Sequence, residues 1–356
     1  MTVPQYTFPF KHLLGIEPLS PLDVTSILDQ AKAFEEVCEN PEIKVVPALR
    51  KKLVVNLFFE NSTRTRNSFE IAEKRLSAEI VNFDAGSSSL SKGETLIDTA
   101  TNLQAMRPDI IVMRHSAPGA HTLLARHIDA SIVNAGDGAH EHPTQALLDA
   151  YTMREHFGKL NGLSVAIVGD IRNSRVVRSN LWLLTKMGAK VTLVGPPTLL
   201  PAEIKETWPD VELSYDFDEV IPSMDVIMML RCQFERGTGM YIPSQGEYAK
   251  YYQLNAARMK RAGNEAVVLH PGPLNRGVEI TSEVADGPNS LILKQVTNGV
   301  PVRMSVLHLL IPSRVQLTLN AKTPKFLKNR GNLIFQKLAG GDCSPPYQPA
   351  IKRNAV

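Results

Sequence analysis

The chain has 356 residues, of which 43% are hydrophobic and 21% are charged, and its formal net charge is +3. This length favours about two domains, and the composition is typical of a globular protein that buries a sizeable core. The small net charge and the lack of a long Lys/Arg block argue against a nucleic-acid partner, and no apolar run is long enough to span a bilayer.

The cysteines and the N-terminus indicate a reducing compartment. Cys38, Cys232 and Cys343 lie far apart and show no CxxC spacing. This pattern argues against a disulfide framework or a zinc knuckle. Pro4 and Pro9 interrupt the N-terminal residues, which therefore do not resemble a signal peptide. We expect a cytoplasmic protein.

Strand-like and helical patterns alternate through the first half of the chain. The apolar, β-branched run 53–59 predicts a strand, and the apolar spacing over 67–79 predicts a helix after it. Further strands are expected at 79–83, 109–113 and 131–134, and further helices at 95–106, 120–127 and 143–157.

A turn-rich segment, 158–162, precedes a second alternation of the same kind. Its strands are expected at 164–168, 190–194, 225–230 and 266–269, and a long helix at about 300–320 closes the fold. Alternating βα units imply parallel sheets flanked by helices. We therefore predict an α/β protein of two lobes, each a parallel sheet flanked by helices, with the active site in the cleft between them.

The predicted lobes correspond to two domains, residues 1–150 and 151–299. The 300–320 helix is expected to pack back on the first domain. Residues 324–356 are basic and then rich in Gly and Pro, so they predict a flexible tail.

The segment 62–65 lies where the first strand turns into a helix. Unpaired N–H groups and the positive end of the helix dipole point outward at such a position, which favours an anion. Ser62, Thr63 and Thr65 add short donors, and Arg64 adds a planar fork that matches phosphate oxygens. An ordinary helix cap is the alternative, because Ser and Thr are favoured there in any case.

Two further loops carry isolated cations. Lys92 lies in the Gly- and Ser-rich loop 85–94, which is either a solvated linker or a closing lid. Arg114 ends a strand that is expected to be buried, where a guanidinium requires a carboxylate or a ligand anion.

The loop 136–145 carries His140, His142 and Gln145. His142 and Gln145 are three residues apart at a helix start, so both can face the same side. The two histidines could bind a metal, but no further ligand set has suitable spacing. A neutral, hydrogen-bonding histidine in an anion site is the favoured interpretation.

In the second half, polar residues again follow the predicted strands. The segment 168–175 lacks the G-x-G-x-x-G spacing, which disfavours a nicotinamide-dependent dehydrogenase. Arg175, Arg231 and Gln233 follow strands in equivalent positions, as does the His-Pro-Gly-Pro sequence at 270–273. A single arginine is most often part of a surface ion pair. Several at equivalent strand ends indicate an anionic ligand.

Together these segments resemble the aspartate and ornithine carbamoyltransferase family over about residues 10–310. The matching pieces, in family order, are Phe-Phe-Glu-Asn-Ser-Thr-Arg-Thr at 58–65, Ser-Lys-Gly-Glu-Thr at 91–95, Arg114-His115, His-Pro-Thr-Gln at 142–145, Val-Gly-Asp with Arg175, Arg231-x-Gln233, and His-Pro-Gly-Pro at 270–273. Lys92 and the His-Pro-Gly-Pro sequence favour the branch that acts on aspartate. Gly272 stands where some members of that branch have leucine.

The resemblance implies transfer of a carbamoyl group from carbamoyl phosphate to the amine of L-aspartate, a step of pyrimidine biosynthesis. Its implied carbamoyl phosphate residues are Ser62, Thr63, Arg64, Thr65, Ser88, Arg114, His142, Gln145, Gly272 and Pro273. Its implied aspartate residues are Lys92, Arg175, Arg231 and Gln233. The groups implied to act on the reacting carbamoyl centre are Arg64, Thr65, Lys92, Arg114 and His142.

The resemblance also implies a homotrimer in which a neighbouring subunit supplies Ser88 and Lys92. Residues 1–150 would bind carbamoyl phosphate and residues 151–299 would bind aspartate. The family uses no metal and no organic cofactor. The sequence leaves open whether regulatory or dihydroorotase-like subunits bind. A carbamoyltransferase for ornithine or another amine, and a non-catalytic scaffold homologue, are the alternatives.

Overall fold

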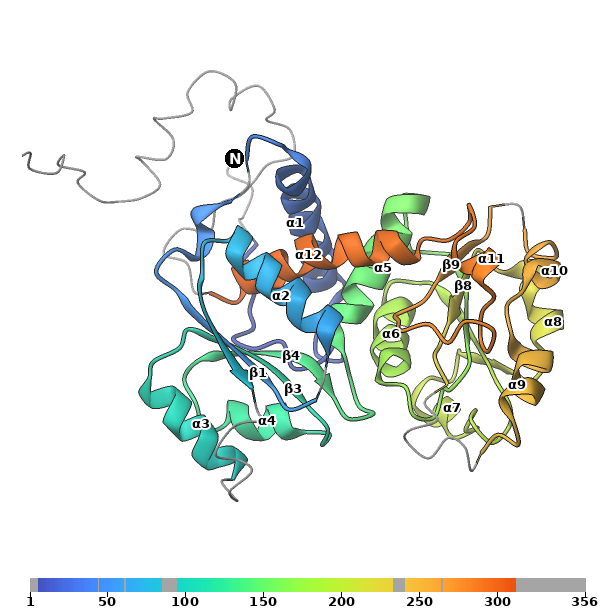
Figure 1. Ribbon diagram of the computed structural model, residues 1–356, viewed down its shortest axis with the longest axis horizontal. Coiled ribbons are helices and arrows are strands. Elements are labelled where there is room, and N and C mark those ends of the chain that lie inside the picture. Colours follow the sequence, from blue (N-terminus) through green and yellow to red (C-terminus); the bar gives the residue numbers. More distant parts are fainter. Residues whose placement is uncertain are drawn as a thin grey trace, which may run out of the picture. The chain divides into compact units, whose positions relative to one another are not determined.

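Two separate parallel sheets form the framework of the chain (Figure 1). The computed structural model describes residues 6–43, 45–60, 62–84, 95–232, 241–263 and 265–311. All of them belong to one compact unit of the chain. Both sheets are flanked by helices, so the predicted two-lobed α/β fold is confirmed.

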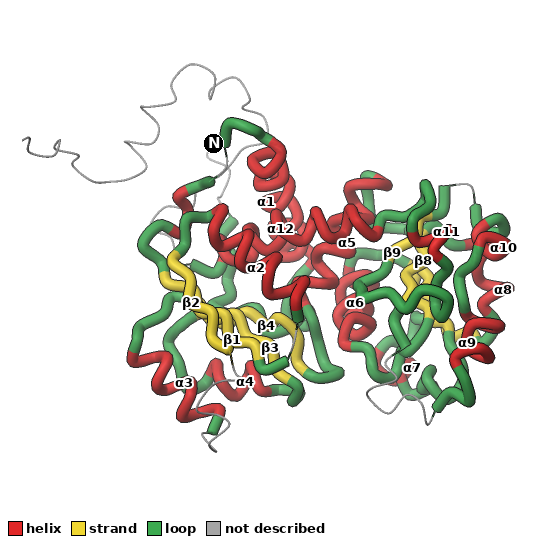
Figure 2. Tube along the Cα trace, in the orientation of Figure 1, coloured by secondary structure: helices red, strands yellow, loops and turns green. Residues whose placement is uncertain are grey.

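The first sheet has the strand order β2-β1-β3-β4. Its strands are β1 (Leu53–Phe58), β2 (Glu79–Asp84), β3 (Ile110–His115) and β4 (Ser131–Asp137). Three helices follow them, α2 (Thr63–Arg75), α3 (Leu96–Ala105) and α4 (Ala120–Ala125). Val54 packs in one apolar cluster with Phe69 of α2, whereas Val55 packs in another with Leu103 of α3. Successive strand residues therefore bury both faces of the sheet, with α3 and α4 on one side and α2 on the other (Figure 2).

The second sheet has the order β7-β6-β5-β8-β9, again all parallel. Its strands are β5 (Ser164–Val168), β6 (Lys190–Val194), β7 (Glu212–Ser214), β8 (Val226–Met229) and β9 (Val267–Leu269). The longer helices of this region are α5 (Pro143–Phe157), which leads into it, α6 (Arg175–Lys186) and α9 (Gln245–Tyr252). The shorter ones are α7 (Ile204–Thr207), α8 (Phe217–Val220), α10 (Ala256–Met259) and α11 (Ser282–Ala285). Helices α5 and α6 pack on each other, which joins the two lobes through apolar side chains.

Two long helices from opposite ends of the chain lie together. Helix α1 (Pro21–Glu39) packs against α12 (Ile292–Leu309), and α12 also contacts α2 and α5 (Figure 1). The predicted start of the closing helix was wrong, because α12 begins eight residues earlier, at Ile292, and ends at Leu309. Residues 312–320 of the predicted range lie outside the described residues. Pro301 lies inside α12, although proline is more usual in a first helical turn.

The other boundaries agree more closely, with one informative exception. Helix α2 begins at Thr63, whereas the apolar spacing predicted a start near residue 67. The first turn of α2 is polar because it faces a cavity and not the core, so the apolar period begins one turn later. Helices α1 and α6 to α11 and the strand β7 were not predicted from the sequence. The proposed tail 324–356 lies outside the described residues.

The strand orders fix where a ligand can lie. In the first sheet the direction in which successive strands are added reverses between β1 and β3, and in the second between β5 and β8, although all strands are parallel. Open parallel sheets bind ligands at such switch points, beyond the carboxyl ends of the strands. Among the described helices, none combines the length and the apolar character needed to cross a membrane.

Candidate active site

A cavity of about 740 Å³ extends across both switch points. Among the described residues predicted from sequence, it is lined by Ser62, Thr63, Arg64, Thr65, Arg114, His142, Gln145, Arg175, Arg231, Gly272 and Pro273. The structure therefore brings all of these residues together. The remaining predicted residues, Ser88, Lys92 and Gln233, lie outside the described residues.

The start of α2 presents its N-terminus to the cavity. Ser62 is the N-cap residue, but its side chain makes no capping hydrogen bond, and the first turn contains no acidic residue. The ordinary cap interpretation is therefore not supported by the geometry. Thr65 is buried, whereas Arg64 is exposed towards the cavity. Backbone N–H groups and the helix dipole make this end attractive to an anion.

Arg114 and Arg175 meet at one carboxylate. Arg114 Nε donates to Glu60 Oε2 over 3.2 Å, and Arg175 Nη2 donates to the same oxygen over 2.8 Å. Arg114 comes from the end of β3 and Arg175 from the start of α6, so Glu60 links the two lobes. Gly136 has a φ of +120°, and a Cβ there would lie 3.0 Å from the Arg175 guanidinium. Glycine at this position therefore permits the approach of Arg175.

Arg64 lies in α2, after β1, and Arg231 lies just after β8, so they approach the cavity from the two sheets. Partial burial, and then the neighbouring charge of Arg231, lower the pKa of Arg64. Gly272 has a φ of +66°, in the left-handed region, and a Cβ there would lie 3.0 Å from Arg64 Cζ. Gly272 thus places backbone directly beside the Arg64 guanidinium.

His142 is fully buried at the N-cap of α5. Burial, with smaller contributions from Arg114 and Arg175, holds the pKa of His142 well below its usual range. The imidazole is therefore neutral at neutral pH and can donate one hydrogen bond without adding charge. Among the described residues, its Nδ1 atom has no hydrogen-bond partner.

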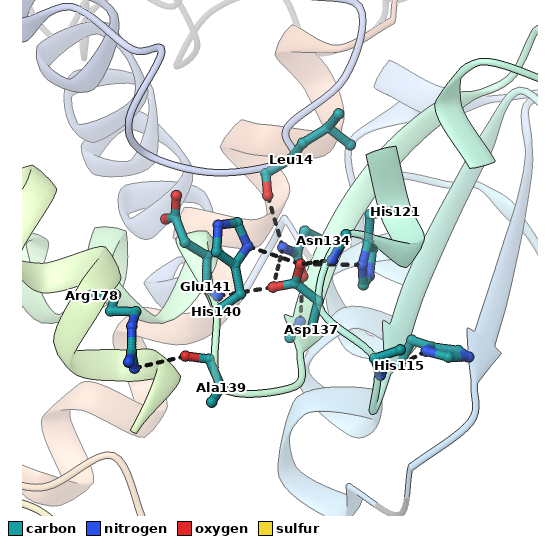
Figure 3. Close-up of polar contacts among 12 residues, drawn as sticks. Leu14, His115, His121, Asn134, Asp137, Ala139, His140, Glu141 and Arg178 are labelled. Carbon is teal, nitrogen blue, oxygen red and sulfur yellow. Dashed lines mark hydrogen bonds and ion pairs between the residues drawn. The ribbon is translucent and has the colours of Figure 1, made fainter. Parts of the chain in front are cut away.

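The loop that carries His142 is built around a buried carboxylate, Asp137 (Figure 3). Asp137 accepts hydrogen bonds from Asn134 Nδ2 and the Glu141 backbone N–H, and it contacts His140 Nδ1 over 3.0 Å. His140 is thereby held on the loop, and it does not line the cavity. No group of three His, Cys, Asp or Glu side chains suited to a metal occurs within the described ranges.

Several polar residues that line the cavity received no individual role from the sequence, among them Glu60, Ser68, Ser174, Gln295 and Arg303. Arg303 is the clearest omission. It is fully buried on α12, donates from Nη1 to Ser68 Oγ over 2.9 Å, and forms no ion pair among the described residues. Burial lowers the pKa of Arg303 to about 10, so it stays charged at neutral pH. An arginine between Val302 and Met304 on an apolar helix is a signal that could have revealed it.

The charged residues that line the cavity are mostly positive. Its lining contains five arginines and one glutamate, an excess of four positive charges among the described lining residues. Buried cations are costly without counter-charges. The arrangement therefore fits a ligand, or a pair of ligands, that carries several negative charges.

Comparison with known families agrees with this geometry. Residues 11–155 match the family model "Aspartate/ornithine carbamoyltransferase, carbamoyl-P binding domain". Residues 161–310 match "Aspartate/ornithine carbamoyltransferase, Asp/Orn binding domain". The chain belongs to the aspartate/ornithine carbamoyltransferase family.

The names of individual relatives specify the aspartate branch of this family. The chain is 55% identical to an aspartate carbamoyltransferase catalytic subunit of Thermobifida fusca, over 88% of this chain and 100% of that protein. It is 57% identical to the corresponding subunit of Salinispora tropica, over 85% of this chain and 98% of that one. A crystal structure of aspartate transcarbamoylase from Trypanosoma cruzi with carbamoyl phosphate and aspartate matches with a TM-score of 0.77 and 33% identity, over 83% of this chain and 95% of that chain.

Proposed function

We propose that this chain transfers the carbamoyl group of carbamoyl phosphate to the amine of L-aspartate, giving N-carbamoyl-L-aspartate and phosphate. The observation that carries the proposal is the convergence of Arg64, Arg114, Arg175 and Arg231 on one cavity. The two substrates together bring about four negative charges, which matches the excess positive charge of the lining. In this role the chain serves pyrimidine biosynthesis in the cytoplasm.

Carbamoyl phosphate binds at the α2 end of the cavity. The phosphate lies at the N-terminus of α2, against Ser62, Thr63, Arg64 and Thr65, with Arg114 beside it and Ser88 completing the site. Thr65, Arg114 and His142 polarise the carbamoyl oxygen. Gln145 and the backbone of 271–273, including Gly272 and Pro273, hold the carbamoyl amide. This division makes 1–150 the carbamoyl phosphate-binding domain, with the α12 region packed on it.

Aspartate binds from the side of the second lobe, residues 151–299. Arg175, Arg231 and Gln233 hold its carboxylates, together with Lys92. A cavity with excess positive charge favours a co-substrate with two carboxylates over one with a second ammonium group, which argues against ornithine.

The reaction needs positioning and electrostatics, with no covalent enzyme intermediate. The neutral aspartate amine attacks the carbamoyl carbon, a C–N bond forms, and the C–O bond to phosphate then breaks. The departing phosphate accepts the proton that the amine loses. Donors aimed at the oxyanion contribute about 3–4 kcal/mol each, and holding the two reactants together contributes roughly 7–11 kcal/mol.

The assembly is a homotrimer with shared sites, since Ser88 and Lys92 act in a neighbouring subunit's cavity. The test is product analysis of the purified chain with carbamoyl phosphate and either aspartate or ornithine, with the mass in solution measured in parallel. We expect carbamoyl-aspartate and a trimer. Formation of citrulline, or of no product by a folded trimer, would reject the proposal.

A further inference from the structure

A buried carboxylate outside the cavity lining connects several of its polar groups. Asp149 lies on α5, is 0% exposed, and accepts three hydrogen bonds from side-chain amides. Gln145 Nε2 and Gln295 Nε2 donate to Oδ1 over 2.8 and 2.7 Å, and Asn180 Nδ2 donates to Oδ2 over 2.9 Å. Three residues, one each from α5, α6 and α12, therefore share one buried anion.

An ionised carboxylate only accepts hydrogen bonds, so each neighbouring amide must turn its NH₂ group towards it. Burial raises the pKa of Asp149 to about 6, which leaves the group ionised at pH 8. For Gln145 this orientation leaves Oε1 as the polar atom that faces the cavity. Among the described residues, no hydrogen bond reaches that oxygen. Gln145 therefore offers an acceptor, and not a donor, to a ligand.

The same carboxylate orders the opposite side of the cavity through Gln295. With its Nε2 held by Asp149, Gln295 turns Oε1 towards the His270 backbone N–H, which donates to it over 2.9 Å. His270 Nδ1 in turn accepts from the Gly272 N–H over 2.8 Å. The loop 270–273 and the Gln145 side chain, which approach the cavity from different lobes, are thus aligned by one group.

We infer that Asp149 is a positioning residue. By fixing Gln145 as a hydrogen-bond acceptor, it makes the cavity select a substrate that carries an NH₂ group on the reacting carbon. This inference rests on the proposed function. Without Asp149, the two glutamines can bond to each other, and Gln145 can turn its NH₂ group to the cavity. The NH₂ group of Gln145 would then face the NH₂ group of the carbamoyl ligand, and neither could accept a hydrogen bond from the other. The preference of the cavity for a carbamoyl group over an acetyl group would therefore fall.

The test compares ligands that differ at that one group. Binding of carbamoyl phosphate, acetyl phosphate and inorganic phosphate is measured at pH 8 by calorimetry, for the wild-type trimer and for Asp149→Ala. Acetyl phosphate has a methyl group in place of NH₂. We expect Asp149→Ala to lower the carbamoyl-to-acetyl affinity ratio about tenfold, while phosphate affinity changes less than about threefold.

Two further variants separate this role from simple packing. Asp149→Asn keeps an acceptor at Oδ1, and Asn180 Oδ1, which has no partner among the described residues, can receive its new NH₂ group. This variant should restore the ratio. Asn180→Ala removes a hydrogen bond to the same carboxylate without touching Gln145, and it should keep the wild-type ratio with a comparable loss of thermal stability.

The outcomes are distinguishable. An unchanged ratio in Asp149→Ala, or an equal change in Asn180→Ala, would overturn the inference. If the alanine variant does not fold, Asp149→Ser, whose hydroxyl is too short to hold Gln145, replaces it under the same criteria. If the wild-type trimer itself shows no preference for carbamoyl phosphate, the proposed function fails and not the role of Asp149 alone.

Discussion

Arg64 follows a strand of the first sheet and Arg231 follows a strand of the second, yet both line the same cavity. The neighbouring charge of Arg231 contributes to the lowered pKa of Arg64. Like charges this close are costly, and a bound dianion removes that cost. Single-residue changes at the two arginines should therefore separate the two substrates.

Arg64→Ala should abolish turnover and weaken the binding of phosphate, because Arg64 supplies the planar donor at the α2 N-terminus. A lost charge-assisted hydrogen bond costs about 1.5–3 kcal/mol, or roughly ten- to a hundredfold in affinity. Phosphate binding by calorimetry measures this. Lys74→Ala, on the same helix and paired with Glu70, is the control and should bind normally. Retained turnover would remove Arg64 from the site.

Arg231→Ala should raise the KM for aspartate by roughly ten- to a hundredfold, with a change of less than about threefold for carbamoyl phosphate. The reason is its place at the end of β8, in the second lobe. Initial-rate kinetics with each substrate varied in turn give both constants. Arg276→Ala is the matched control, since Arg276 pairs with Asp286 on the surface of the same lobe. Equal effects on both substrates would contradict the assignment.

The burial of Glu73 predicts how the stability of the protein depends on pH. It is buried on α2, accepts one hydrogen bond from Asn56 Nδ2, and burial raises its pKa to about 7 from a usual value of 4.5. The folded state keeps this proton between pH 4.5 and 7, whereas the unfolded state loses it. The free energy of unfolding therefore falls as the pH rises through this window.

Glu73→Gln should remove that fall. Relative to wild type, the variant should gain about 2–3 kcal/mol of unfolding free energy between pH 4 and pH 8. Urea unfolding at fixed protein concentration and several pH values measures the difference. A variant that shows the wild-type pH slope would mean that Glu73 is ionised in the folded protein.

Among the elements, α6 does more than cover the second sheet. Ser179 Oγ on α6 accepts from the His142 backbone N–H over 2.8 Å and donates to Glu141 Oε2 over 2.7 Å. Glu141 also accepts from the Ile16 N–H over 2.8 Å. Helix α6, the His142 loop and the N-terminal segment are therefore joined by buried hydrogen bonds.

Ser179→Ala should lower kcat about tenfold, with smaller changes in both KM values, because it leaves the His142 N–H and Glu141 without a shared partner. Leaving buried groups unpaired should also cost about 1–3 kcal/mol of stability. Thr185→Ala removes only a hydrogen bond within the same helix and should keep normal kcat. Equal kcat losses in the two variants would point to a general effect on α6.

For the whole molecule, a shared site makes activity depend on more than one chain. Lys92→Ala and Arg64→Ala chains should each be inactive alone. Mixed trimers contain interfaces where an intact Arg64 faces an intact Lys92, roughly one site in four after random assortment of equal amounts. Mixing under dissociating conditions, followed by rate measurement, should recover that share of the activity. Verified mixed trimers without activity would show that each site lies within one chain.

The local pattern of the sequence determined much of the fold. The helix predicted at 143–157 and the strands predicted at 164–168 and 190–194 match α5, β5 and β6 without a shift. These segments are buried along most of their length, and local backbone preference and burial agree there. The closing helix begins eight residues before its predicted start, and α12 contains Pro301 in its interior.

For the site, the sequence by itself identified which residues carry suitable charge and hydrogen-bonding groups, because each follows a strand in a parallel α/β arrangement. Only the tertiary structure decided how those groups are paired and oriented. Glu60 holding Arg114 and Arg175, Arg303 buried without an ion pair among the described residues, and Asp149 aligning Gln145 all depend on contacts between elements distant in the chain. Such contacts depend on the packing of side chains in space, which residue type and spacing do not encode locally.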